Sequence, residues 1–410
     1  LGISGIVALN ILCLLLCAWL AYAIAKKIDI QRPYLAFIFT LLSPIFLDNT
    51  VSSLTEPLCA LLVLLSVYFL TNQKFALGAA VAGLIPYARS EGFIVLFAVG
   101  IYLLFFKKEY RAILFLLAGS LLFNTLGWII ENEPFWVITQ NPYINFQLSG
   151  KNICGSGSIL HYIRAGHYTF GLITSALIAT GIGLFALKYL HKKQWIYKPN
   201  FTLVVLIFIL YFAAHAFIWW QGMMGSCGYV RVMAVIAPLA AIIASYGVNQ
   251  FLQLIQQWLP HPVHQLLTKT VVVFLLVNSF YVPYRYYAYK YPLTISEEQG
   301  QYVKLSDWYK QQDLEERTKI YLYPYFSLLV DIDPYNQDEH LDLWASTLQF
   351  TKKGDIIIWD GHFGPNECGI PLESLESNKN WKKIHSIIPA ERIVTLNDGT
   401  FEIHVFEKIK

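Results

Sequence analysis

Long apolar runs, each closed by polar or charged residues, fill the first 290 positions of the chain. A bilayer core about 30 Å thick needs about 20 helical residues to cross it, and several runs approach that length. The pattern predicts about nine or ten hydrophobic helical segments, at roughly 5–25, 34–47, 54–70, 75–87 with 93–106, 112–130, 170–187, 201–219, 232–252 and 270–282.

The segment at 75–106 differs from the others because Arg89 interrupts it near its middle. Its length is too short for two full crossings and a turn, since each crossing takes about 20 residues. We therefore predict a re-entrant hairpin that enters the membrane and returns to the same side.

The pattern changes near Tyr291. Residues 298–311 have the periodicity of an amphipathic helix, and 319–323, 355–359 and 401–406 have that of short strands. The chain is thus predicted to be a polytopic α-helical membrane protein, with a transmembrane helical domain at 1–289 and a mixed α/β domain at 290–410.

Composition supports this division. The chain has 410 residues, of which 56% are hydrophobic and 14% charged, whereas an ordinary soluble domain has about 25% charged residues. Of the 27 acidic residues, 20 lie from Tyr291 onward. These numbers exclude a wholly soluble protein. The absence of a basic cluster or a nucleic-acid-binding motif excludes nucleic acid as a partner.

The positive charges predict the orientation, because short cytosolic loops are rich in Lys and Arg. When successive loops are assigned alternately to the two sides of the membrane, one assignment leaves only Lys151 and Arg164 in the extracytosolic loops. It places twelve cations on the cytosolic side: Lys26, Lys27, Arg32, Lys74, Lys107, Lys108, Arg111, Lys188, Lys192, Lys193, Lys198 and Lys269. The α/β domain is then extracytosolic, and a bacterial inner membrane is the simplest setting.

The six cysteines form neither a disulfide framework nor a metal-ligand cluster by their spacing. Cys154 and Cys227 both fall on the extracytosolic side of this topology. A bridge between them is therefore compatible with the sequence.

Polar residues interrupt the apolar runs in a few places, and ionisable groups at membrane depth cost about 2.5 to 3.5 kcal/mol each unless they face a polar cavity. The stretch from Asp48 to Pro57 carries two carboxylates, Asp48 and Glu56, and Pro57 marks a helix start. Two interpretations stay open: a capped, solvated loop, or acids that line a cavity.

The stretch from Pro86 to Gly92 contains Arg89 and Glu91. These two residues could neutralise each other and stabilise the hairpin. Alternatively, Arg89 could bind a phosphate, because a guanidinium donates to two oxygens at once.

The stretch from Gly222 to Arg231 is rich in small residues and ends in a cation without an acidic neighbour in the sequence. Arg231 could extend to the membrane interface, or it could pair with a lipid phosphate or with Glu56. The outer loop at 131–168 has the size of an acceptor-binding rim or of a plain connector.

In the α/β domain, Asp360, His362 and Glu367 form a polar cluster in the sequence. Loops after strands are usually polar, so a structural role is favoured over a functional one. No known catalytic motif occurs in this part of the sequence.

Three runs of the sequence carry a resemblance to a known family. The run from Leu54 to Leu58 with the run from Gly83 to Gly92, and the run from Gly225 to Arg231 followed by Pro238, resemble motifs of polytopic glycosyltransferases of the C-type fold (GT-C). Relatives in family 39 include protein O-mannosyltransferases and lipid A aminoarabinose transferases. Ser90 departs from the frequent proline of the pattern.

The resemblance implies an enzyme that transfers a sugar, a hexose such as mannose for example, from a polyprenyl-phosphate donor to a glycan, lipid or protein acceptor hydroxyl, with inversion and on the extracytosolic side. It implies that the donor phosphate binds Arg231 and Arg89, with Glu91 and Tyr229 in support, and that Asp48 and Glu56 line the cavity. The resemblance does not settle a cofactor: these acids would hold sugar hydroxyls, or a divalent metal if one is used.

The family's usual base is an acid in the first outer loop. Leu1 resembles the start of the family's second helix, so the first helix and its loop are expected upstream of Leu1, and the catalytic base is not assigned. A fragment or an inactive gene product would both fit. Two other hypotheses stay open: a transporter or flippase of lipid-linked sugars, because broken helices and buried charge also suit transporters, and a noncatalytic subunit of a glycosylation complex.

Overall fold

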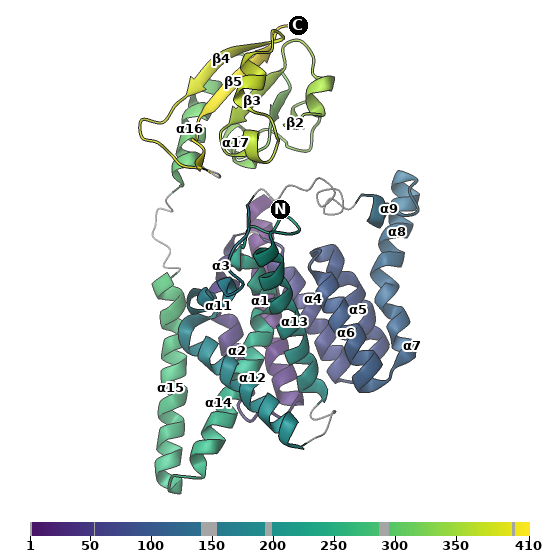
Figure 1. The fold of residues 1–410 in the computed structure, drawn as a ribbon, viewed down its shortest axis with the longest axis vertical. Helices are drawn as coiled ribbons and strands as arrows, with labels where there is room; N and C mark the ends of the chain where they lie inside the picture. The colour runs from purple at the N-terminus through teal and green to yellow at the C-terminus, as the bar shows by residue number, and fades with distance from the viewer. Residues whose placement is uncertain (1, 53, 141–153, 193–198, 287–294, 396–397) are drawn as a thin grey trace. The chain divides into compact units, whose positions relative to one another are not determined.

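The structure, a computed structural model, describes residues 2–52, 54–140, 154–192, 199–286, 295–395 and 398–410. The chain divides into two compact units, Leu1–Ala288 and Tyr289–Lys410. The first is helical and the second contains a sheet (Figure 1). Lys151, Lys193, Lys198 and part of the predicted outer loop lie outside the described residues.

Helices joined by short connecting segments make up the described part of the first unit. Their bounds are α1 Gly2–Lys27, α2 Pro33–Leu41, α3 Pro44–Val51, α4 Glu56–Thr71, α5 Phe75–Ala88, α6 Gly92–Ile101, π-helix η1 Tyr102–Lys107, α7 Tyr110–Ile113, 3₁₀-helix η2 Leu114–Leu117, α8 Ala118–Glu131, α9 Trp136–Thr139, α11 His161–Arg164, π-helix η3 His167–Gly171, α12 Leu172–Lys192, α13 Pro199–Gln221, 3₁₀-helix η4 Val230–Ile236, α14 Ala237–Gln256 and α15 His261–Tyr286.

Six of the described helices are long and apolar enough to cross a membrane, or seven if α2 and α3, bent by 47°, form one span. Three shorter apolar helices accompany them, at Glu56–Thr71, Phe75–Ala88 and Gly92–Lys107. The predicted polytopic membrane fold is confirmed. The predicted helix start at Pro57 is confirmed as well, because α4 begins at Glu56 with a proline in its first turn.

Helix α14 lies in the core of this unit, where every residue from Ala237 to Gln250 is buried. It packs on α12 at a very close approach. A Cβ at Gly181 of α12 would come within 2.5 Å of the carbonyl oxygen of Ile243, and a Cβ at Gly247 of α14 within 2.3 Å of that of Leu177. Small residues of this kind let two backbones meet inside a membrane.

Helices α4, α5 and α6 stand side by side (Figure 1). The α5–α6 pair is a helical hairpin whose turn holds Arg89, Ser90 and Glu91. At the other end of the hairpin, the Lys107 ammonium lies 5.9 Å from the centre of the Phe75 ring. Whether the hairpin is re-entrant stays a prediction.

The second unit holds a five-stranded sheet with the strand order β2-β1-β3-β5-β4. Strands β1 and β2, and β1 and β3, are parallel, whereas β5 is antiparallel to β3 and to β4. The bounds are α16 Glu297–Tyr309, β1 Lys319–Tyr321, α17 Pro324–Val330, β2 His340–Asp342, 3₁₀-helix η5 Thr347–Phe350, β3 Ile356–Asp360, α18 Phe363–Asn366, α19 Leu372–Glu376, β4 Trp381–Ile387 and β5 Ile403–Lys408.

Both faces of this sheet are covered. Along β3, Ile356 and Ile358 join one buried cluster, while Ile357 and Trp359 join another on the opposite face. The predicted helix and three predicted strands appear as α16, β1, β3 and β5, so the predicted α/β domain is confirmed.

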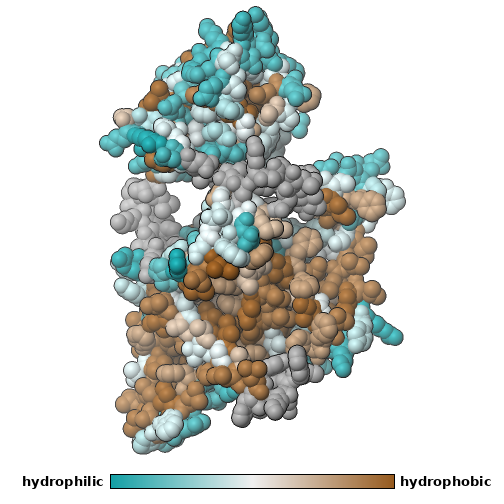
Figure 2. Space-filling view, in the orientation of Figure 1, coloured by the Kyte–Doolittle hydropathy of each residue, from teal (hydrophilic) through white to brown (hydrophobic). Residues whose placement is uncertain are grey.

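The two units differ in surface chemistry. On the face seen in Figure 2, apolar residues cover most of the middle of the helical unit, and polar residues cover most of the sheet unit. A broad apolar surface of this kind is what a protein exposes to lipid rather than to water.

Candidate functional site

The candidate site is built where α4 begins and the α5–α6 hairpin turns. Glu56, the first residue of α4, has a completely buried side chain. Arg89 follows the last residue of α5 in an extended conformation, with φ −156° and ψ 138°, which ends that helix. Glu91 immediately precedes α6. The three charged residues therefore lie at helix ends: the start of α4, the end of α5 and the start of α6.

The Arg89 guanidinium lies between the two carboxylates. Its Nη1 is 2.9 Å from Oε1 of Glu56, and its Nη2 is 2.8 Å from Oε1 of Glu91. Nη1 also donates to Oγ1 of Thr55 at 3.1 Å. The predicted Arg89–Glu91 pair therefore exists, but Arg89 is shared with Glu56, a partner that the sequence pattern had not indicated.

Arg231 brings a second cation to the same carboxylate. Its Nε is 3.7 Å from Oε1 of Glu56, and its side chain is 45% exposed, compared with 17% for Arg89. The guanidinium carbon lies 4.9 Å from the centre of the Tyr229 ring, a cation–π contact. The pairing of Arg231 with Glu56, one of the alternatives from the sequence, is thus present in the structure.

Two arginines and two glutamates make the cluster neutral in total, but its geometry is uneven. Arg89 contacts both acids closely, whereas Arg231 contacts one acid at the longer distance. Arg231 is therefore the cation with the more open coordination. An incoming anion would meet it first.

Several buried polar atoms here make no well-aligned hydrogen bond to another described residue, although Oε1 of Glu56 is ion-paired with Arg89. They are both carboxylate oxygens of Glu56, Nε of Arg89 and Nε2 of His215, whose ring lies on α13 within reach of the charges of Arg89 and Glu91. Buried polar groups nearly always find partners, so such a group of atoms indicates a place for a polar ligand or water. His215 was missed because it is a lone polar residue in an apolar run.

The three helices that end at this cluster are short. Their 14 to 16 residues correspond to about 21 to 24 Å of helix, less than the roughly 30 Å of a bilayer core. Each of these helices alone is therefore shorter than one full crossing.

Asp48 does not join the cluster. It lies on α3, is half-buried, and makes no side-chain hydrogen bond or ion pair within the described part of the chain. Its predicted role in lining a cavity stays a prediction.

The loop at 222–229, which precedes Arg231 and η4, is held by a disulfide between Cys154 and Cys227. The bridge that the sequence left open is therefore formed. It joins two segments that are 73 residues apart.

No group of three or more His, Cys, Asp or Glu residues in the described ranges is arranged to hold a metal ion. Glu56 and Glu91, the acids that come together here, both use an oxygen on Arg89.

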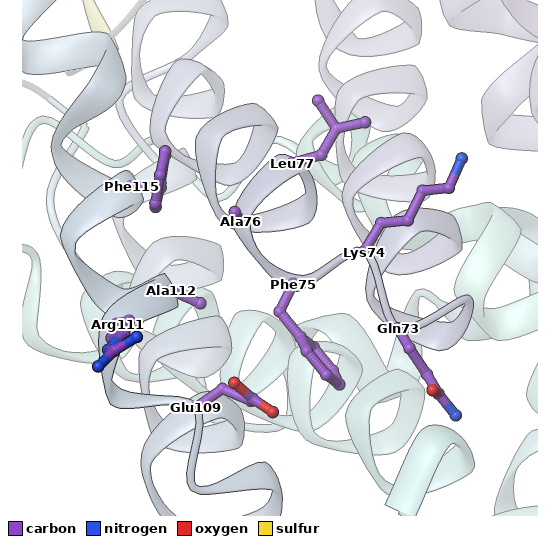
Figure 3. Close-up of a pocket in the computed structure, with 9 residues that line it drawn as sticks. All are labelled: Gln73, Lys74, Phe75, Ala76, Leu77, Glu109, Arg111, Ala112 and Phe115. Atoms are coloured by element: carbon purple, nitrogen blue, oxygen red, sulfur yellow. The ribbon is translucent and has the colours of Figure 1, made fainter.

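A cavity lies away from this cluster (Figure 3). It measures about 490 Å³ and is formed where α5 begins, whereas Arg89 follows the end of that helix. Its lining residues are Gln73, Lys74, Phe75, Ala76, Leu77, Glu109, Arg111, Ala112 and Phe115. It is separate from the charged cluster.

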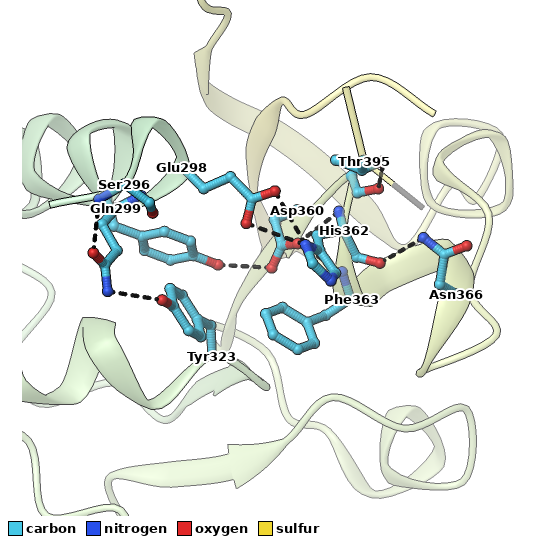
Figure 4. A network of polar contacts seen from close by, with 11 residues as sticks. Ser296, Glu298, Gln299, Tyr323, Asp360, His362, Phe363, Asn366 and Thr395 are labelled. Atoms are coloured by element: carbon cyan, nitrogen blue, oxygen red, sulfur yellow. Dashed lines mark hydrogen bonds and ion pairs between the residues drawn. The ribbon is translucent and has the colours of Figure 1, made fainter. Parts of the chain in front are cut away.

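In the α/β unit, the polar residues after β3 form a closed network (Figure 4). Asp360 accepts hydrogen bonds from the Tyr302 hydroxyl at 2.7 Å and from the backbone N–H groups of His362 and Phe363 at 2.8 Å each. Both of its oxygens are therefore used inside the protein. This occupancy agrees with the structural role favoured from the sequence.

His362 pairs with a residue distant in the sequence. Its Nδ1 is 3.1 Å from both carboxylate oxygens of Glu298, at the start of α16. This hydrogen bond raises the pKa of His362, while burial raises the pKa of Asp360. Glu367 contributes only its charge, and burial raises its pKa.

Comparison with solved structures identifies the architecture. The chain is similar to the crystal structure of ArnT from Cupriavidus metallidurans in the apo state, with a TM-score of 0.51 and 8% sequence identity over 96% of this chain and 83% of that one. The fold is therefore GT-C-like, as the resemblance in the sequence implied. No family model and no curated protein matches the sequence.

Proposed function

We propose that this protein is an integral membrane glycosyltransferase that moves a sugar from a polyprenyl-phosphate donor to an acceptor hydroxyl, with inversion, on the extracytosolic side of the membrane. The observation that carries the proposal is the convergence of Arg89 and Arg231 on the buried carboxylate of Glu56. The GT-C-like fold supports it.

The donor phosphate would bind Arg231 first and Arg89 second. Arg231 has the more open coordination, and Tyr229 supports its guanidinium from one face. The two guanidinium groups repel each other, and the negative charge of Glu56 allows them to lie close together. A phosphate between them would make the charge-assisted hydrogen bonds that guanidinium forms best.

The reaction follows from this arrangement. The acceptor oxygen attacks the anomeric carbon, the bond from that carbon to the phosphate oxygen breaks, and the phosphate leaves with the electron pair. A base outside the described site takes the acceptor proton. The two arginines stabilise the negative charge that grows on the leaving phosphate, the role in which fixed donors contribute most.

Two further observations support the extracytosolic side. Disulfides persist in oxidising compartments, so the Cys154–Cys227 bridge favours a site outside the cytosol. The cations at Lys74 and Lys107 lie at the opposite ends of α5 and η1 from the cluster, as expected if those ends face the cytosol.

The test uses the protein in proteoliposomes with a radiolabelled polyprenyl-phosphate sugar and extracts of envelope glycans and lipids as acceptors. A labelled glycan or lipid product, absent with Arg231→Ala, supports the transferase. Movement of the donor across the bilayer without product would instead support a flippase. Neither product nor movement would support a noncatalytic subunit.

A further inference from the structure

The short loop before Arg231 is attached to a second segment at successive residues. Cys227 is bridged to Cys154, with the two Cα atoms 4.9 Å apart. At the next position, the carbonyl oxygen of Gly228 accepts a hydrogen bond of 2.8 Å from Nε2 of His161. Tyr229 and Arg231 follow directly, so the attachment lies next to the cation site in the chain.

The same two segments also meet around Trp219, near the end of α13. The Gly157 N–H donates to the Trp219 carbonyl at 3.2 Å, and the rings of His161 and Trp219 are 5.8 Å apart. Gly228 has φ +65°, and a Cβ there would lie 2.7 Å from the indole ring. The loop therefore fits closely between Trp219 and the segment that begins at Cys154.

Besides these ties, the loop has a hydrogen bond of its own, from the Ser226 N–H to the Met223 carbonyl at 3.0 Å, and a side-chain hydrogen bond between Ser226 and Tyr162. Residues 222–229 are not part of any helix or strand. The glycines at 222, 225 and 228 have positive φ, and a segment so rich in glycine can adopt many conformations when it is not held. A cross-link between distant segments reduces that freedom. The ion pair from Arg231 to Glu56, at 3.7 Å, is too long to fix the loop by itself.

We infer that the Cys154–Cys227 disulfide and the His161–Gly228 hydrogen bond form a clamp that positions Arg231 beside Glu56, so that an intact bridge is needed for tight binding of a polyprenyl phosphate. Cys154, Cys227 and His161 are positioning residues, since they act through Arg231. The inference rests on the proposed role of Arg231 in binding the donor phosphate.

The test measures binding of undecaprenyl phosphate to the full chain in lipid nanodiscs. Cys154→Ser with Cys227→Ser should raise Kd about tenfold, and each single substitution should do the same, because either one abolishes the bridge. Cys13→Ala, which removes a free buried cysteine of α1, is the matched control and should leave Kd unchanged.

A double-mutant cycle separates positioning from general loss of structure. In an Arg231→Ala background, opening the bridge should change Kd less than twofold, because no guanidinium remains to be positioned. An equal tenfold loss in both backgrounds would overturn the inference.

His161 gives a second test that leaves the bridge intact. His161→Gln places an amide donor near the position of Nε2 and should keep Kd within about threefold of the wild type, whereas His161→Ala should weaken binding more. Identical Kd values for the wild type and both variants would remove His161 from the clamp.

Hydrogen exchange at residues 222–232 distinguishes failure of this inference from failure of the proposed function. Suppose that exchange is faster in the bridge variants than in the wild type, but that the wild type binds no undecaprenyl phosphate. The clamp would then be supported and the proposed transferase function would be contradicted. If the bridge variants show the same exchange and the same Kd as the wild type, the clamp is contradicted while the proposed function is not.

Discussion

Arg89 and Glu56 come from the ends of two different helices and meet with Nη1 2.9 Å from Oε1. The Glu56 side chain is fully buried, and its described partners are the two cations, Arg89 and Arg231. Burying a carboxylate is costly unless it is paired. This pair therefore links the packing of α4 and α5 to the properties of the candidate site.

Glu56→Gln should destabilise the protein more than Glu91→Gln. Removing one partner of a buried pair costs about 3 to 5 kcal/mol, and the lower end applies here because Arg89 keeps Glu91. Glu91 is 21% exposed, so its loss should cost less. Thermal unfolding in detergent measures both variants, and a lower midpoint for Glu91→Gln than for Glu56→Gln would contradict this ranking.

Some of this site was predictable from the sequence. Arg89 and Glu91 are two residues apart, so their pairing needed only a local turn, and Pro57 marked the start of α4. The contact of Arg89 with Thr55 and Glu56 depends on how α4 packs against α5, which no local pattern contains. His215 reaches the site only because α13 packs beside α6.

The same distinction holds in the α/β unit. Strands β3 and β5 are continuous apolar or alternating runs, and both were predicted. Strand β4, Trp381–Ile387, was missed because a register shift between Lys383 and His385 breaks its alternation. Strand β2, His340–Asp342, has three residues like β1, but it lies in a polar stretch without the apolar run that marked 319–323. Strand β4 is defined by its pairing with β5, and β2 by its pairing with β1.

Arg231→Ala should reduce sugar transfer by about 10² to 10³, the loss expected when one fixed donor to a developing negative charge is removed. Its unfolding midpoint should stay near that of the wild type, because the side chain is half exposed. Arg89→Ala should lower both transfer and stability, since it leaves the buried Glu56 with only the distant Arg231.

Radiolabel transfer and thermal unfolding, run on the same preparations, check this difference. Wild-type transfer by both variants would remove the phosphate assignment. A large fall in the midpoint for Arg231→Ala would show that this residue has a structural role instead.

Because of the His362–Glu298 contact, the α/β unit should lose protection from amide hydrogen exchange as the pH rises. Glu298 raises the pKa of His362 above its ordinary value near 6.5. A group whose folded pKa is raised contributes stability that is fully present below the unfolded pKa and is lost as the pH rises through the folded pKa. The contact should therefore stabilise the start of α16 below about pH 6.5 and weaken above it.

Amide exchange of α16 and α18 in the full chain, corrected for the intrinsic pH dependence of exchange, measures this effect. His362→Gln should flatten the pH response above pH 6.5, where Asp360 and Glu367 are the other acids near the ring. A response that is unchanged in His362→Gln would assign it to another group.

Gly181→Ala and Gly183→Ala should have opposite effects although both substitutions lie in α12. At Gly181 the added Cβ would come within 2.5 Å of the Ile243 carbonyl oxygen, a backbone atom that cannot rotate away, so α12 and α14 must separate. Overpacking of this kind typically costs about 1 to 3 kcal/mol. At Gly183 nothing lies within 4 Å, and replacing a helical glycine by alanine stabilises by about 0.5 to 1 kcal/mol. Unfolding midpoints of the two variants compare the sites directly, and a neutral Gly181→Ala would show that α12 and α14 are not held at this distance.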